Sequence, residues 1–243
     1  MIRNLNVSKS ELNKLLNDII LRKKKLSFSE AYSLMTYLLH LNEPYIVPTW
    51  TAVFASIQTR GVEEEEIVGF LEAFKDFTNF EINNLKKPKI LDKEKIISLV
   101  GSGKDDIKTI NVSTLSSIVL ASLRKIRVVK HGSYGGSSVY GNRNILEAFG
   151  ISTKNLKDLR LDVLEKEFIY FLPIEEFIKE FDRKYGGNFL FFHPLSYVLA
   201  GVLNPYYLDW LVMGITDFNR TMLSAKILKR YNYKGIVISG EIK

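Results

Sequence analysis

Residues 127–149, RVVKHGSYGGSSVYGNRNILEAF, form the stretch that decides the fold. A short apolar run ends at Lys130 and His131, a loop rich in glycine and serine follows, and residues 142–149 carry a helical pattern. A strand that leads through a loop into a helix is the repeating unit of α/β domains. Such domains bind ligands beyond the carboxyl ends of their strands, so this loop lies where a ligand would bind. A surface loop without function is the alternative.

The loop itself has the chemistry of an anion site. One cation (Lys130), three glycines and three serines occur within nine residues, among them Gly132, Ser133, Ser137 and Ser138. Glycines let backbone N–H groups approach a phosphate closely, and hydroxyls and an ammonium add further donors. His131 either belongs to this site or only packs behind Lys130.

Two motifs upstream have the same character. GSGKDD at residues 101–106 follows an apolar run at 96–100, and its acids suit a site that also holds Mg²⁺ or ribose hydroxyls. TINVST at residues 109–114 precedes a predicted helix at 115–124. Ser, Thr and Asn there are either plain helix caps or part of an anion site at a helix N-terminus.

Further apolar runs at residues 168–172, 211–215 and 236–239 are typical of strands, with helical stretches between most of them. Alternation of strands and helices predicts an α/β domain with a largely parallel sheet flanked by helices. The first 80 residues instead carry helical periodicity throughout. Ser27 and Glu30 have capping-box spacing, Pro48 is expected to open a third helix, and Glu63 to Glu66 a fourth. A polar, basic segment at 83–89 is expected to be a linker between this small all-α N-terminal domain and the α/β domain.

Composition narrows the function. Net charge is +7 and the pI about 9.3, which favours an anionic partner such as a phosphate ester or nucleic acid. The chain has no cysteine and three histidines, so thiolate chemistry is excluded and a zinc site disfavoured. No apolar run is long enough to span a membrane, and no signal peptide is recognisable, so we expect a cytoplasmic protein.

The order of GSGKD, TINVST, KHGSYGGSS and YGNRNILEAFG resembles the anthranilate phosphoribosyltransferase family of glycosyltransferases, whose fold nucleoside phosphorylases share. The corresponding family pattern is G-T-G-G-D, T-x-N-I-S-T, K-H-G-N-R-x-x-S-S and S-G-S-A-D-x-L-E-x-L-G. Residues 58–67 and 193–205 resemble the family as well. The resemblance implies a helical domain at residues 1–80, joined by returning helices at about 174–202. It places an α/β phosphoribosyl-binding domain at 81–173 and 203–243.

The family also implies site residues. The donor, phosphoribosyl pyrophosphate, would be bound by a set of thirteen residues, with Ser113 also a ligand of Mg²⁺. These are Gly101, Lys104, Asp105, Thr109, Asn111, Ser113, Thr114, Lys130, His131, Gly132, Ser137, Ser138 and Asn142. Acceptor contacts would come from Gly101, Ser133 and His193. The resemblance also implies a homodimer that forms through the helical domain. It implies no membrane partner.

Departures from the family bear on the acceptor and the metal. Ser133 and His193 stand where the family has the Asn and Arg that contact anthranilate, and His is a poor substitute for a carboxylate-binding Arg. The family's acidic Mg²⁺-binding pair lies beyond residue 243, so we expect a naturally short form or a fragment with a weakened metal site. An active phosphoribosyltransferase for anthranilate or a related nitrogen acceptor is favoured. The alternatives are a non-catalytic or nucleic-acid-binding paralogue and a nucleoside phosphorylase.

Overall fold

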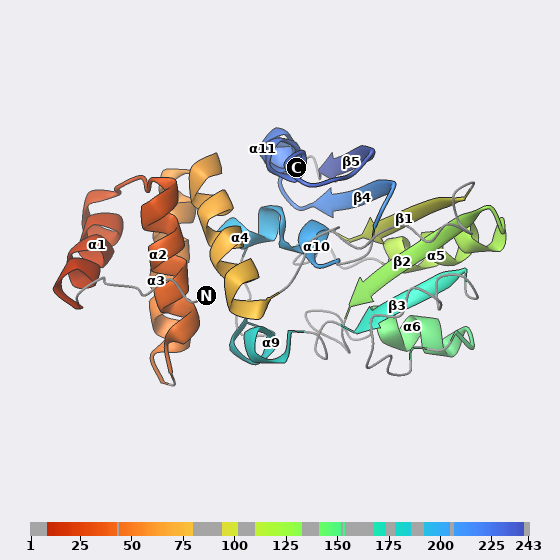
Figure 1. The fold of residues 1–243 in the computed structure, drawn as a ribbon, viewed down its shortest axis with the longest axis horizontal. Coiled ribbons are helices and arrows are strands. Elements are labelled where there is room, and N and C mark those ends of the chain that lie inside the picture. The colour runs from red at the N-terminus through yellow and green to blue at the C-terminus, as the bar shows by residue number, and fades with distance from the viewer. Residues whose placement is uncertain are drawn as a thin grey trace. The chain divides into compact units, whose positions relative to one another are not determined.

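The computed structural model describes residues 9–42, 44–79, 94–101, 110–132, 141–151, 153, 168–173, 178–185, 192–204 and 207–240. The chain divides into two compact units (Figure 1). The helical unit comprises Met1–Phe80 and Phe191–Leu195, and the α/β unit comprises Glu81–Leu190 and Ser196–Lys243. Phe191–Leu195 is thus the part of the segment 174–202 that clusters with the helical unit, and the domain boundaries implied by the resemblance stay a prediction.

The helical unit contains four described helices, which lie in the region of predicted helical periodicity: α1 (Lys9–Arg22), α2 (Phe28–His40), α3 (Ile46–Arg60) and α4 (Glu64–Thr78). The capping box at the start of α2 is confirmed, because the Ser27 hydroxyl accepts the Glu30 N–H and the Glu30 carboxylate accepts the Ser27 N–H. The expectation that Pro48 opens the third helix was wrong by two residues. Pro48 lies in the first turn of α3, where its missing N–H would have had no helical partner.

Helices α2 and α4 pack closely, and a glycine makes this possible. A Cβ atom added to Gly69 would lie 2.7 Å from the Phe28 carbonyl oxygen and 2.8 Å from the Ala31 Cβ. Apolar stripes on α2, α3 and α4 supply the core of this unit, and their buried residues include Leu34, Phe54 and Phe70. On α1, Ile19 is buried and its neighbour Ile20 is 41% exposed, so only part of that stripe faces the core.

The α/β unit is built on a five-stranded sheet in the order β3-β2-β1-β4-β5, in which all neighbours are parallel. The strands are β1 (Lys95–Val100), β2 (Ile126–Gly132), β3 (Ile169–Pro173), β4 (Trp210–Ile215) and β5 (Gly235–Gly240). All five overlap the apolar runs that predicted them. The α/β class with a parallel sheet and an all-α N-terminal region is therefore confirmed.

Helices connect and cover these strands. The described ones are α5 (Val112–Ser122), α6 (Asn142–Ala148), α9 (Lys179–Tyr185), α10 (Leu199–Val202) and α11 (Thr221–Leu228), with short 3-10 turns at Pro194–Tyr197 and Phe218–Arg220. Helix α5 packs against β1, β2 and β3, whereas α10 packs on β4 and α11 on β5. Leu99, Ala121 and Val128 form the core between α5 and the sheet.

One buried carboxylate holds the amino ends of three strands together. Asp209 precedes β4, and its side chain accepts the Ile96 N–H of β1 at 3.0 Å and the Lys234 ammonium at 2.8 Å. Its backbone oxygen accepts the N–H groups of Lys234 and Gly235. The carboxyl ends of the strands lie at the opposite edge of the sheet. Among the described residues, no helix is long and apolar enough to cross a membrane.

Candidate functional site

Lys130 lies at the carboxyl edge of the sheet, on the strand next to the central strand β1. It lies near the end of β2, and its side chain is fully buried. The Nζ atom donates to the Leu99 carbonyl oxygen at 2.6 Å and to the Ser113 Oγ at 2.8 Å. One ammonium therefore joins the end of β1, the first turn of α5 and β2. An ammonium has three donors, and the described residues accept hydrogen bonds from two of them.

Burial changes the acid–base behaviour of this lysine. Removal from water penalises the ammonium and lowers the pKa of Lys130 to about 7. Its two hydrogen-bond partners among the described residues are neutral oxygens, and neither supplies a compensating charge. A buried cation that no carboxylate of the described ranges contacts is well matched to an anionic ligand, which would stabilise the charged form.

Asn111 organises the start of α5. It is the N-cap residue, and its Oδ1 accepts the Thr114 N–H at 3.1 Å and the Ser113 hydroxyl at 3.2 Å. Of the two alternatives for TINVST, the helix cap is thus observed at Asn111, and α5 begins three residues before the expected start; the anion site stays a prediction. Because the Ser113 hydroxyl donates to Asn111, its oxygen is left to accept from Lys130. The cap and the cation site are one hydrogen-bonded unit.

Asn142 links this unit to the second loop. At the start of α6, its Oδ1 accepts the Asn111 Nδ2 at 2.6 Å and the Thr114 hydroxyl at 2.9 Å, while its Nδ2 donates to the His131 carbonyl oxygen at 3.1 Å. A Cβ at Gly132 would lie 2.7 Å from the Asn142 Nδ2, so only glycine allows this approach. We call Asn111, Ser113, Thr114, Lys130 and Asn142 the carboxyl-edge cluster.

His131 lies beside the cluster with its ring buried. Burial first, and the neighbouring Lys130 charge second, lower the pKa of His131 to about 3, against a hydrogen bond with the Ala200 backbone that raises it. The imidazole is therefore neutral at physiological pH. Its Nδ1 is buried and has no hydrogen-bond partner among the described parts of the chain.

Gly101 and His193 are described residues outside the cluster that were also singled out from the sequence. Gly101 follows β1 and is exposed, and a Cβ there would lie 3.4 Å from the Ser113 Oγ. His193 belongs to the helical unit, where its buried ring stacks on Phe54 at 5.0 Å between ring centroids. Lys104, Asp105, Thr109, Ser133, Ser137 and Ser138 lie outside the described residues.

Sequence reasoning missed one partner of the cluster, the Leu99 carbonyl oxygen. A backbone atom has no sequence signature, and only strand pairing brings Leu99 to Lys130, which lies 31 residues later. The bridging role of Asn142 was also not foreseen, although the residue itself was selected. Its position directly after Gly141, at the start of a helical pattern, was the available signal.

These features define a class of protein: a parallel α/β domain with a buried cation, hydroxyls and amides at its carboxyl edge, suited to an anionic ligand. The family described as "Glycosyl transferase family, a/b domain" matches residues 93–241, and this chain belongs to that family. The resemblance to its anthranilate phosphoribosyltransferase members is confirmed by the relatives that follow.

The anthranilate phosphoribosyltransferase of Pyrococcus furiosus is 31% identical over 223 residues, which cover 89% of this chain and 61% of the relative. The structure of the Thermus thermophilus enzyme matches with a TM-score of 0.71 and 22% identity, over 93% of this chain and 65% of that chain. The Saccharomyces cerevisiae enzyme, solved in complex with PRPP and Mg, matches with a TM-score of 0.72 and 17% identity. The match covers 95% of this chain and 66% of that chain. This chain thus spans less than two-thirds of the length of each.

Proposed function

We propose that this protein binds phosphoribosyl pyrophosphate and transfers the ribosyl 5-phosphate to a nitrogen nucleophile, anthranilate or a related acceptor. In this reaction the bond from the anomeric carbon to the pyrophosphate oxygen breaks, and the electron pair leaves with pyrophosphate. The acceptor nitrogen forms the new bond to that carbon and releases a proton. The relatives support this proposal by family and by fold.

The observation that carries the proposal is the buried Lys130 ammonium between Leu99 and Ser113 at the carboxyl edge. It lies at the N-terminal turn of α5, where backbone N–H groups and the helix dipole also favour an anion. The Lys130 charge would stabilise the negative charge that grows on the departing pyrophosphate. Asn111 and Asn142 hold Ser113 and Thr114 in place, so the site is organised before the donor arrives.

The remaining roles are extensions of the same proposal. Donor contacts are proposed for Gly101, Lys104, Asp105, Thr109, His131, Gly132, Ser137 and Ser138, in addition to the carboxyl-edge cluster. Acceptor contacts are proposed for Gly101, Ser133 and His193. The His193 ring is buried and stacks on Phe54 within the helical unit.

Mg²⁺ fits the described residues only in company with the donor. The oxygens of the cluster are neutral, and no group of three or more His, Asp and Glu that could hold a metal occurs within the described ranges. Mg²⁺ is usually held by carboxylates together with substrate phosphates. We therefore propose that the Ser113 Oγ is one protein ligand and that donor phosphates supply others. When bound, the ion would neutralise charge on the leaving group.

Calorimetric titration of phosphoribosyl pyrophosphate, with and without Mg²⁺, tests the proposal. We expect micromolar binding that Lys130→Met weakens about 10- to 100-fold, because a hydrogen-bonded charge is lost. Lys125→Met is the matched control, since Lys125 is exposed and precedes the opposite end of β2. Absence of binding in both conditions, or equal effects of the two variants, would reject the donor site. An acceptor screen by turnover follows if the donor binds.

A homodimer through the helical unit is proposed as well. Leu21 on α1 is 74% exposed and Ile20 is 41% exposed, which leaves apolar surface on that helix. Light scattering of the purified chain, with Leu21→Glu for comparison, tests this point. A monomer at all concentrations would reject it.

A further inference from the structure

The amino edge of the sheet, opposite the carboxyl-edge cluster, carries exposed cations. Lys95 begins β1 beside Ile126 of β2, and Lys125 directly precedes β2. Helices α5 and α11 connect parallel strands and therefore run against them, so their carboxyl ends lie at the same edge. Arg124 follows the end of α5, and Lys229 follows the end of α11. All four of these cationic side chains are exposed.

The carboxylates described at this edge are already paired with other cations. Glu94 accepts from the Arg127 Nε at 2.6 Å, and Asp209 accepts from the Lys234 ammonium at 2.8 Å. None of the four exposed cations forms an ion pair with a residue of the described ranges. A helix dipole accounts for cations at the ends of α5 and α11, but not for Lys95 at the start of a strand. The edge therefore carries unbalanced positive charge, which favours a polyanion.

Arg124 has a backbone conformation that favours glycine. Its φ angle is +53°, in the left-handed region, and it lies just after a helix, where glycine is the usual residue. An arginine in this conformation is more strained than a glycine would be. The chain thus keeps a cationic side chain at a position where glycine would fit the backbone better, and the charge can be removed there without straining the fold.

Trp210 adds a flat aromatic surface to the same edge. It begins β4 in register with Ile97, so it shares a face of the sheet with Lys95, and it is 40% exposed. A Cβ added to Gly235 would lie 2.4, 2.5 and 2.7 Å from three adjacent atoms of the six-membered ring. Such similar distances place that point over the face of the ring and not beyond its rim. One face of the indole therefore covers Gly235, and the exposed surface is left to the other face and the rim.

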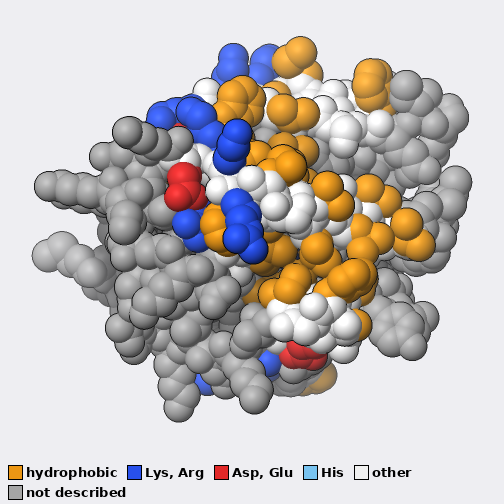
Figure 2. Space-filling model, turned by 90° about the vertical axis from the view of Figure 1, so that its right-hand side faces the viewer, with side chains coloured by type: hydrophobic (Ala, Val, Ile, Leu, Met, Phe, Trp, Pro, Cys, Tyr) orange, Lys and Arg blue, Asp and Glu red, His pale blue; other side chains and the backbone are white. Residues whose placement is uncertain are grey.

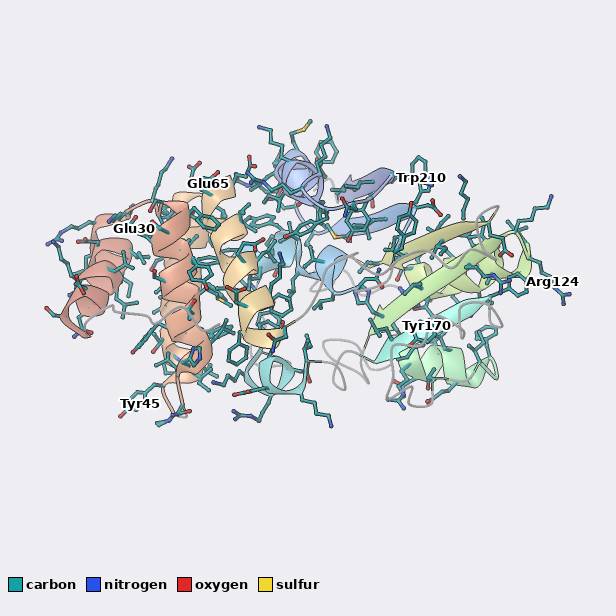
Figure 3. The ribbon with its side chains drawn as sticks, in the orientation of Figure 1. Glu30, Tyr45, Glu65, Arg124, Tyr170 and Trp210 are labelled. Atoms are coloured by element: carbon teal, nitrogen blue, oxygen red, sulfur yellow. The ribbon has the colours of Figure 1, made fainter. Side chains whose placement is uncertain are left out.

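The figures place these groups at one end of the α/β unit. Arg124 and Trp210, both labelled in Figure 3, lie toward the end that Figure 2 faces. Figure 2 shows Lys and Arg side chains gathered there next to hydrophobic side chains. Cations that follow a phosphate backbone, combined with an aromatic ring on which a base can stack, are the usual features of a surface that binds single-stranded nucleic acid.

We propose that this edge binds single-stranded nucleic acid, with a base stacked on Trp210 and phosphates held by Lys95, Arg124, Lys125 and Lys229. We call these five residues the amino-edge surface. Strands lie about 4.8 Å apart, so the surface extends about 14 Å from β2 to β5, which suits a short stretch of nucleotides. An indole that lies flat on the sheet can stack on a base but does not project as a lipid anchor would, which favours nucleic acid over an anionic membrane. The proposal is independent of the proposed function, which uses the opposite edge.

Fluorescence anisotropy of a labelled oligothymidine of about 16 nucleotides, titrated with the full chain at several salt concentrations, tests this assignment. We expect binding that weakens as salt rises, with a log–log slope of about −0.7 for each phosphate contact. The chain has two tryptophans, and Trp50 is fully buried, so quenching of the emission on binding reports on Trp210.

Matched variants separate charge from stacking. Arg124→Gly should weaken binding several-fold at low salt and reduce the steepness of the slope by about 0.7, while Tm does not fall, because glycine adopts a φ of +53° without strain. Lys23→Gly is the control, since Lys23 is an exposed cation with a φ of +55° in the helical unit, and it should leave binding unchanged. Trp210→Leu should remove the quenching and weaken binding at least about fivefold without changing the slope.

Four results would overturn the proposal. One is absence of oligonucleotide binding. A second is an equal effect of Lys23→Gly and Arg124→Gly, because net charge alone would then explain the binding. A third is an effect of Lys130→Met as large as that of Arg124→Gly, because the strand would then lie at the carboxyl edge. The fourth is binding to phosphatidylserine vesicles that is retained when oligonucleotide binding is absent, which would identify a membrane surface as the partner.

Discussion

The Lys130 ammonium lies 2.8 Å from the Ser113 hydroxyl oxygen, so the carboxyl end of β2 and the first turn of α5 meet at one hydrogen bond. That contact joins two motifs separated in the sequence by a complete helix. It also places a buried cation where no described carboxylate balances it, and this makes the stability and the ligand affinity of the protein depend on pH.

The first prediction concerns stability and pH. The pKa of Lys130 is about 7 in the folded protein and about 10.4 in an unfolded chain. Between these values the unfolded chain binds more protons, so the contribution of this group to the free energy of unfolding rises with pH. The slope is up to about 1.4 kcal/mol per pH unit. Urea unfolding at pH 7 to 10 should show this rise for the native chain and not for Lys130→Met. Parallel profiles for the two proteins would contradict the prediction.

The second prediction concerns donor binding and pH. An anion requires the protonated ammonium, and in the ligand-free site the pKa of Lys130 is about 7. Affinity for phosphoribosyl pyrophosphate should therefore fall above pH 7, by at most about tenfold per pH unit. Calorimetry in buffers of different ionisation enthalpy should detect proton uptake at pH 8. A pH-independent affinity, with no proton uptake, would show that Lys130 does not contact the donor.

The third prediction concerns Gly132 and Asn142. In Gly132→Ala the new Cβ would meet the Asn142 Nδ2 at 2.7 Å and displace the side chain that joins Asn111 to the His131 carbonyl. We expect a loss of about 1–3 kcal/mol in the free energy of unfolding, typical of overpacking. Asn142→Ser shortens the obstructing side chain, so the double variant should lose less than the sum of the two single losses. Strict additivity in the double-mutant cycle would contradict the proposed contact.

The fourth prediction concerns Glu66 in the helical unit. Its fully buried carboxylate pairs with Arg60, and it accepts the Leu26 N–H at 2.8 Å and the Glu63 N–H at 2.9 Å. Glu66→Gln leaves the buried Arg60 guanidinium without a counter-charge, which should cost about 3–5 kcal/mol. Glu65→Gln, on the exposed side of the same helix, should stay within about 0.5 kcal/mol of the native chain. Denaturant unfolding of the two variants provides the comparison.

Local patterns explain what was predictable in the fold. The Ser27 capping box needs only residues three apart, and the five strands coincide with short apolar runs, so both were recognised without tertiary information. The start of α3 was misplaced because Pro48 is tolerated anywhere in the first turn of a helix and does not mark its first residue. The candidate site was found because glycine, hydroxyl and amide residues follow successive strands.

The amino-acid sequence by itself determined the class of fold, the family and the identity of most residues in the carboxyl-edge cluster, since periodicity and motifs are local properties. Only the tertiary structure decided how these residues interact. Parallel pairing of β1 and β2 sets Lys130 against the Leu99 carbonyl, and burial there lowers the pKa of the lysine to about 7. The position of α5 over β1 to β3 likewise decides that the Leu99 side chain is buried while the Val237 side chain is exposed to solvent. Burial and electrostatics depend on which groups surround a side chain, and that neighbourhood is assembled from segments far apart in the chain.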